Sequence, residues 1–207
     1  MTTHIPMVPY DFLEPSDRPN FNLYDRLLQE RLIFLNKAVD SELANQTIAT
    51  MLYLNAEDTQ SDIRLHIHAC NAAEKDSLTA GLAIYDTMQC LESDVTTVCA
   101  GAVTGMATFL LAMGAPQKRL ALPHARISLS QPSHIVQAGT ASNITIEAEE
   151  LLKLRRLLAN LLAKRTGQST EKILQDTERD LHLSAQDALA YGLIDHIVSS
   201  PKSAERN

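Results

Sequence analysis

The stretch "DIRLHIHA", from Asp62 to Ala69, sets the class of fold. Apolar and polar side chains alternate along it, which is typical of a half-exposed strand. We predict a helix in "SLTAGLAIYDTMQCL" (77–91), a second strand in "DVTTVCAG" (94–101) and a second helix in "MATFLLAMG" (106–114). Gly114 is expected to cap that second helix at its C-terminus. The alternation of strand and helix favours an α/β fold with largely parallel strands.

The same alternation extends in both directions along the chain. Residues 22–30 predict a helix and 31–35, "RLIFL", a strand. Residues 41–58 predict a helix with Ser41 as its N-cap. Further on, we expect one or two strands in 118–132, a long amphipathic helix at 144–165, a helix in 169–180, and a short helix and strand in 184–198.

Composition excludes several classes of protein. Of the 207 residues, 45% are hydrophobic and 21% charged, as in soluble globular proteins, and one domain is expected. The formal net charge of -7 argues against a general nucleic-acid binder and against docking on anionic membranes. The sequence begins with no signal-peptide pattern, and its most apolar stretch is too short to cross a bilayer. Cys70, Cys90 and Cys99 lack paired spacing, so we expect reduced thiols in a cytoplasmic protein.

Six segments carry a resemblance to a known family. They are "IPMVPY" (5–10), "YDRLLQERLIFL" (24–35), "LTAGLAIYDTMQ" (78–89), "KRLALPHARI" (118–127), "TGQSTEKILQDTERD" (166–180) and "YGLIDHIV" (191–198). They resemble the proteolytic subunit of the Clp protease, ClpP, of peptidase family S14. The resemblance implies an α/β fold of the ClpP type, a crotonase-like ββα superhelix with a protruding handle helix. It also implies a double-ring tetradecamer around a chamber, with a Ser-His-Asp triad in each active subunit.

The resemblance also divides the chain. It implies an N-terminal axial segment at residues 1–20 and a ClpP-like domain at 21–198, with the handle at about 133–166. A C-terminal tail would occupy residues 199–207. No cofactor is implied.

Two of the three triad positions of the family are changed in this sequence. The nucleophile turn of the family aligns with residues 101–107, which places Gly105 at the serine position. The segment that holds the family's histidine aligns with 126–132 and places Ser130 at the histidine position. Asp180, the second aspartate of "DTERD", matches the family's aspartate. A triad needs a hydroxyl, an imidazole and a carboxylate, so only the carboxylate is left.

Substrate-binding segments of the family are altered as well. The family's glycine-rich oxyanion segment aligns with 68–77, "HACNAAEKDS", which is longer and contains no glycine. The family's glycine-rich substrate strand is reduced to Gly139. We therefore interpret the chain as a non-catalytic paralogue of the ClpR kind, a pseudoenzyme and structural subunit of an ATP-dependent Clp core.

Two other interpretations stay open. One is an active ATP-dependent serine endopeptidase subunit with a relocated nucleophile, for which Thr104 or a Ser130–His134 pair are the candidates. The other is a different crotonase-fold enzyme, which needs a CoA-binding surface that the sequence does not show. If the chain is non-catalytic, we expect Asp180 to be an N-cap or an ion-pair residue near Arg179.

His66, His68 and Cys70 are the candidate metal ligands. At a spacing of two on a strand they face one way, and imidazole and thiolate both bind zinc. A polar outer strand face explains the same pattern, and no fourth ligand is evident apart from Cys90. We expect no bound metal.

The expected partners are active ClpP subunits and, through the assembly, an AAA+ unfoldase such as ClpC, ClpX or ClpA. In the family, aromatic residues on the strand at 62–69 help line the cleft that receives the unfoldase. Here Arg64, His66 and Cys90 replace them, so direct docking is doubtful unless other residues, such as Tyr53, rebuild the cleft. The leucine-rich helix at 144–165 aligns with the handle and fits burial against a second subunit. Neither nucleic acid nor membrane is an expected partner.

Overall fold

The computed structural model describes residues 7–9, 20–69, 77–132 and 140–198. The helices of this part of the chain are α1 (Leu23–Gln29), α2 (Ser41–Glu57), α3 (Ser77–Cys90), α4 (Met106–Ala112), α5 (Ala141–Thr166), α6 (Thr170–Asp176) and α7 (Ala185–Tyr191). Its strands are β1 (Met7–Pro9), β2 (Asn20–Asn22), β3 (Leu32–Leu35), β4 (Ile63–Ala69), β5 (Val95–Thr104), β6 (Arg119–Ala121), β7 (Arg126–Leu129), β8 (Leu181–Ser184) and β9 (His196–Ile197). The expected helices and strands are therefore present.

A seven-stranded sheet lies at the centre of the fold. Its strands run in the order β3-β4-β5-β6-β9, and β7 pairs with both β5 and β8. Every pairing in this sheet is parallel except β7 with β8. The expectation of an α/β fold with largely parallel strands is confirmed, and the architecture is consistent with the fold of Clp proteolytic subunits.

Strand β5 has two different partners along its length. Thr97–Cys99 pair with β6, whereas Ala102–Thr104 pair with β7. Gly101 lies between the two segments with a φ of 92°, and a Cβ added there would collide with the ring of His68. Glycine therefore permits the change of partner that brings β7 and β8 beside the end of β5.

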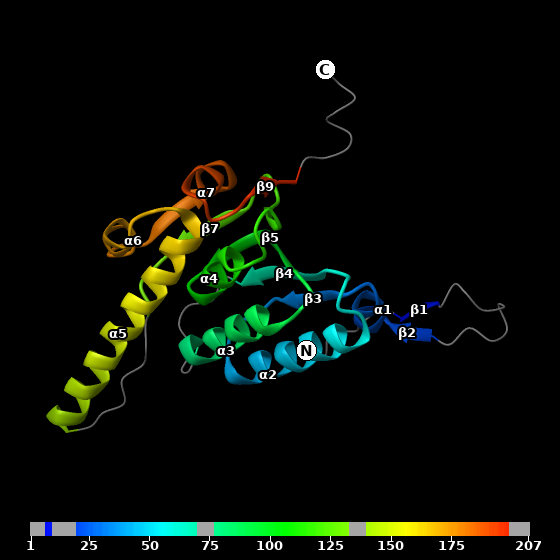
Figure 1. The fold of residues 1–207 in the computed structure, drawn as a ribbon, viewed down its shortest axis with the longest axis horizontal. Helices are drawn as coiled ribbons and strands as arrows, with labels where there is room; N and C mark the ends of the chain where they lie inside the picture. The colour runs from blue at the N-terminus through cyan, green and yellow to red at the C-terminus, as the bar shows by residue number, and fades with distance from the viewer. Residues whose placement is uncertain (1–6, 10–19, 70–76, 133–139, 199–207) are drawn as a thin grey trace, which may run out of the picture.

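Helix α4 follows β5 directly and is buried along its whole length. It packs against β5, α3 and α5, while α2 and α3 lie side by side across the sheet in Figure 1. A helix that is apolar all round belongs in a core, and the run "MATFLLA" meets that requirement. The core thus surrounds the turn that joins β5 to α4.

Helix α5 projects from the body of the molecule (Figure 1). It has 26 residues and starts three residues earlier than the sequence pattern predicts. Its N-terminal residues, 141–150, are all exposed, whereas Leu158, Ala159 and Leu162 are buried against the core. This helix falls within the range expected for the handle, about 133–166, of which residues 133–139 lie outside the described residues.

Two expected helix caps are wrong. Asp40, not Ser41, is the N-cap of α2, since the Asp40 carboxylate accepts a hydrogen bond from the Leu43 amide at 2.7 Å. A carboxylate beside the positive end of a helix is more favourable than a hydroxyl one residue later. Helix α4 ends with Met113 as its C-cap, and Gly114 instead fits closely against Thr97 and Arg119.

The expected terminal segments lie largely outside the described residues. Of residues 1–20, only Met7–Pro9 and Asn20 are described, and β1 pairs antiparallel with β2 there. Residues 199–207, the expected tail, are not among the described residues.

Candidate functional site

Gly105 forms the turn between β5 and α4. Its φ of 56° and ψ of -126° lie in a region where side chains are strained, and its carbonyl accepts the first hydrogen bond of α4, from the Phe109 amide at 3.2 Å. A Cβ at this position would meet nothing within 4 Å. A strained strand-to-helix turn with an open front is the geometry of a nucleophile elbow, here without a side chain.

The β7–β8 pairing brings the other two candidate residues together. Ser128 lies opposite His182 and Leu129 opposite Leu181 in an antiparallel register. Leu129 and Leu181 form the last pair of the ladder, and Ser130 and Asp180 are the residues that adjoin it on the two chains. The antiparallel pairing therefore brings two positions that are 50 residues apart in sequence to the same end of the β7–β8 pair.

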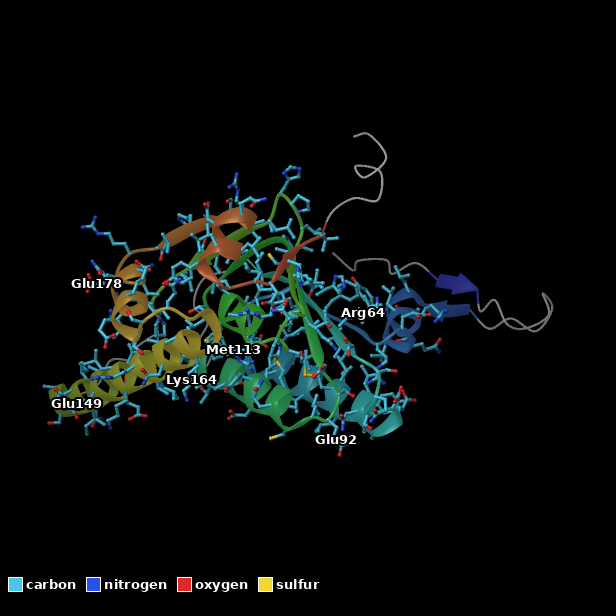
Figure 2. The ribbon with its side chains drawn as sticks, turned by 45° about the horizontal axis from the view of Figure 1, so that its top comes forward. Arg64, Glu92, Met113, Glu149, Lys164 and Glu178 are labelled. Carbon is cyan, nitrogen blue, oxygen red and sulfur yellow. The ribbon has the colours of Figure 1, made fainter. Side chains whose placement is uncertain are left out.

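Gly105, Ser130 and Asp180 all line one cavity of about 500 Å³. Its floor is apolar and includes Leu78, Phe109, Leu129, Leu158, Leu162 and Ile173. Charged groups also border it: Arg155 from α5, and Glu178 and Asp180 from the segment between α6 and β8. Glu178 is labelled in Figure 2 beside that segment, and Glu149 and Lys164 are labelled on α5. The structure thus groups the three positions that the sequence singled out.

The cavity contains hydroxyls but no imidazole among the described residues that line it. Hydroxyl groups come from Ser77, Thr104, Ser130 and Thr177, and Thr177 already donates to the Ile173 carbonyl at 2.7 Å. Nucleophilic catalysis by a serine or threonine needs a base within hydrogen-bond reach, and no such pair is present within the described lining. Thr104, the adjacent candidate, therefore lacks an activating partner there.

Asp180 does not have the structural role that the sequence suggested. Helix α7 begins at its N-cap Ser184 and helix α6 at Ser169, so Asp180 caps neither. It is exposed and makes no ion pair with any described residue, Arg179 included. Within the described residues, Asp180 is therefore neither a helix cap nor part of an ion pair.

A serine–histidine contact lies two positions along the strands from Ser130 and Asp180. The Ser128 hydroxyl and the Nδ1 atom of His182 are 2.6 Å apart. Sequence reasoning considered His134 as the partner of a relocated serine, but residues 133–139 lie outside the described residues. No local sequence signal identifies His182 as the partner of Ser128, because the contact depends on the register of β7 and β8.

His66 and His68, two of the candidate metal ligands, lie on the outer face of β4 and contact other protein groups. His66 stacks on Phe34 with ring centroids 5.4 Å apart, and burial, helped by the charge of Arg64, lowers the pKa of His66. The Nδ1 atom of His68 accepts a hydrogen bond from the Ala102 amide at 3.3 Å. Cys70 lies outside the described residues. Within the described ranges, no group of three or more His, Cys, Asp or Glu side chains could hold a metal ion.

Comparison with known proteins identifies the family to which the chain belongs. The model of the Clp protease family matches residues 16–201. The chain is also 45% identical over 199 residues to ATP-dependent Clp protease proteolytic subunit 3 of Synechococcus sp. (strain CC9902), covering 96% of this chain and 98% of that protein. The chain belongs to the Clp protease family. Members of the Clp protease family assemble into oligomeric protease cores that work with Clp ATPases.

Exposed side chains lie on the segments that the sequence resemblance connects with assembly and unfoldase docking. On α5 the apolar side chains of Ile144, Ile146, Leu152 and Leu157 are exposed. On β4, Arg64 is exposed, and on α2 Tyr53 is 56% exposed with its hydroxyl bonded to Glu57. No described helix is both long and apolar enough to cross a membrane.

Proposed function

We propose that this chain is a non-catalytic structural subunit of an ATP-dependent Clp protease core, a subunit of the ClpR kind that assembles with active ClpP subunits around the proteolytic chamber. The observation that carries the proposal is Gly105. It occupies the strand-to-helix turn at the mouth of the cavity, where an active member of the family needs its nucleophile.

The remaining cavity residues support the same conclusion. Ser130 stands where the resemblance requires an imidazole, and Asp180 keeps a carboxylate that has no described base to orient. The two missing groups act as one unit in serine proteases, so loss of both removes the chemical step. The fold around the cavity is intact, so replacement of the catalytic side chains has not been accompanied by loss of the structure.

Helix α5 supports assembly as the remaining role. Leu152 is 61% exposed and Leu157 44% exposed on a helix that projects from the body. Apolar side chains gathered on a projecting helix are typical of a surface that is buried in an oligomer. In a monomer, these apolar side chains would remain exposed to water. We therefore propose that the helix is buried in a double-ring core with active ClpP subunits.

The unfoldase is proposed to act on the assembly and not on this subunit. Arg64 and the half-buried His66 give the outer face of β4 a polar character, although Tyr53 and Leu52 on α2 remain exposed apolar groups. The exposed thiol of Cys90, which forms no disulfide, supports a reducing, cytoplasmic location.

Co-expression with an active ClpP subunit tests the proposal. We expect a mixed ring complex whose peptidase activity is lost when the serine of the active partner is replaced, because this chain contributes no nucleophile. A complex that keeps its activity after that replacement would contradict the non-catalytic role. A chain that remains a monomer in the presence of every ClpP tested would contradict the structural role.

A further inference from the structure

Ser128 is held by three neighbouring elements. It pairs with Thr104 of β5 on one side and with His182 of β8 on the other. Its carbonyl oxygen accepts a hydrogen bond from the Thr108 hydroxyl of α4 at 2.8 Å. The backbone that carries the Ser128 hydroxyl is therefore fixed by the sheet and by the buried helix, which is the rigid support that a reactive side chain needs.

The side chains of Ser128 and His182 lie on the face of the β7–β8 pair that points away from the core. Ile127, Leu129 and Leu183 fill the opposite, buried face, and alternation along a strand puts residues 128 and 182 on the other one. Ser128 is 8% exposed, while His182 is exposed. The Ser128 hydroxyl is therefore largely buried beside a solvent-exposed imidazole. Neither residue is among those that line the cavity.

The two side-chain atoms have the geometry of a nucleophile and its base. An Oγ–Nδ1 separation of 2.6 Å is within the range in which an imidazole accepts a serine proton during attack. A cross-strand hydrogen bond that only fixes register needs no imidazole, and the ladder of β7 and β8 already fixes register at four residue pairs.

We propose that Ser128 is a covalent acyl-acceptor site for activated electrophiles, with His182 as its base. The Ser128 Oγ attacks an activated acyl or phosphonyl centre, and its proton passes to His182 Nδ1. The new Oγ–acyl or Oγ–phosphonyl bond forms as the bond to the leaving group breaks. The leaving group departs with the electron pair and takes the proton as it leaves, so the imidazole returns to its neutral form.

This site goes beyond the proposed structural role without conflicting with it. Among the described residues no carboxylate makes a hydrogen bond to His182, and the pair lies outside the cavity that would hold an extended peptide. A reaction with an activated electrophile needs only the nucleophile and its base, whereas peptide hydrolysis also needs substrate positioning and stabilisation of the oxyanion. We therefore expect one covalent event per chain and no peptide turnover.

The test uses the full-length chain and an alkyl phosphonofluoridate probe, whose fluoride is the leaving group. Intact mass should rise by one phosphonyl group, and peptide mapping should place that group on Ser128. Ser128→Ala should abolish the adduct. His182→Gln keeps a hydrogen-bonding side chain but removes the base, and should slow labelling by about 100-fold or more. Ser142→Ala, at an exposed position of α5 with no described imidazole partner, is the control and should label like the wild type.

Thermal unfolding of each variant verifies its fold before labelling is compared, and the adduct on the wild-type chain is mapped without any variant. Absence of an adduct, an adduct on another residue, or unchanged labelling of His182→Gln would each overturn the proposal and leave the contact as a structural hydrogen bond. The outcome is separate from the proposed function, which is contradicted by peptide turnover and not by a single adduct on Ser128.

Discussion

Arg119 and Asp195 form a buried, bidentate ion pair between β6 and the segment that leads into β9. The Nε and Nη2 atoms of Arg119 donate to the two carboxylate oxygens of Asp195 at 2.9 and 2.6 Å, and the side chains are only 9% and 8% exposed. Arg119 Nη1 also donates to the Gly192 carbonyl at 2.8 Å and the Arg165 carbonyl at 3.2 Å. One guanidinium therefore joins the sheet edge to the ends of α5 and α7.

Replacement of one partner of this pair should be strongly destabilising. Asp195→Asn leaves a buried, unpaired guanidinium, and we expect it to lower the free energy of unfolding by about 3–5 kcal/mol near neutral pH. Chemical denaturation of the isolated chain measures this difference. Asp94→Asn is the control, because Asp94 is 58% exposed and its ion pair with Lys118 lies at the surface.

The effect of Asp195→Asn should depend on pH. Burial acts to raise the pKa of Asp195, but the hydrogen bonds and charge of Arg119 outweigh it and hold the pKa below its ordinary value of 3.8. A carboxyl whose pKa is lowered on folding stabilises the protein above its unfolded pKa and loses that contribution as the pH falls through its folded pKa. The gap between wild type and Asp195→Asn should therefore narrow below about pH 4, and a gap of equal size at pH 7 and pH 3 would contradict this prediction.

The purified chain should not hydrolyse short fluorogenic peptides. Loss of the catalytic unit lowers kcat by about 10⁶ in a well-studied serine protease, which puts turnover below detection. An active ClpP subunit assayed at the same concentration is the positive control. Peptide turnover that co-purifies with this chain and disappears in Ser128→Ala would show a relocated enzyme.

Restoration of the serine alone should not create an enzyme. Gly105→Ser has room for its side chain, since a Cβ meets nothing within 4 Å, but the described lining of the cavity offers no imidazole to take its proton. Gly105→Ser combined with Ser130→His adds an imidazole to the cavity that Asp180 also lines, and we expect weak turnover at most. Peptidase assays of both variants check this, and robust activity of the single variant would show that the base is not at position 130.

Assembly should depend on the exposed leucines of α5. Leu152→Glu and Leu157→Glu place a charge in the proposed subunit interface, and each should release the chain from the mixed complex while the isolated chain remains folded. Lys153→Glu is the matched control, because Lys153 is 72% exposed and lies next to Leu152. Co-purification with an active ClpP subunit, followed by size exclusion, gives the readout.

Leu158 is not a suitable position for the assembly test, although the sequence pattern places it with the other leucines. It is 6% exposed and lines the cavity inside the chain. Leu158→Glu should therefore unfold the monomer, and a folded, assembly-defective Leu158→Glu chain would mean that α5 packs differently against the core.

The order of helices and strands was predictable because periodicity and turn residues report it directly. The alternation of apolar and polar residues at 62–69 predicted a strand, and the apolar run at 106–112 predicted a buried helix; the structure has both. The caps were less predictable, because Asp40 and Ser41 are both good N-cap residues and only the backbone geometry decides between them. The division of α5 into exposed and buried leucines was not predictable, since its leucines occupy more than one face of the helix.

The candidate site was predictable as three positions but not as a set of contacts. Gly105, Ser130 and Asp180 were assigned from motif alignment, and the structure places them around one cavity. The Ser128–His182 contact depends on the register of two strands that are 54 residues apart, and local sequence patterns do not encode such a register.

The backbone at Gly105 has a consequence for the history of this chain. A serine there must adopt a strained conformation that costs on the order of 1–3 kcal/mol, and without an imidazole at position 130 it yields no activity in return. The reverse order, an imidazole at 130 without a serine, is equally unproductive. Under the proposed non-catalytic role, each single substitution toward a triad is therefore neutral at best, and both changes are needed together before either contributes to peptide cleavage.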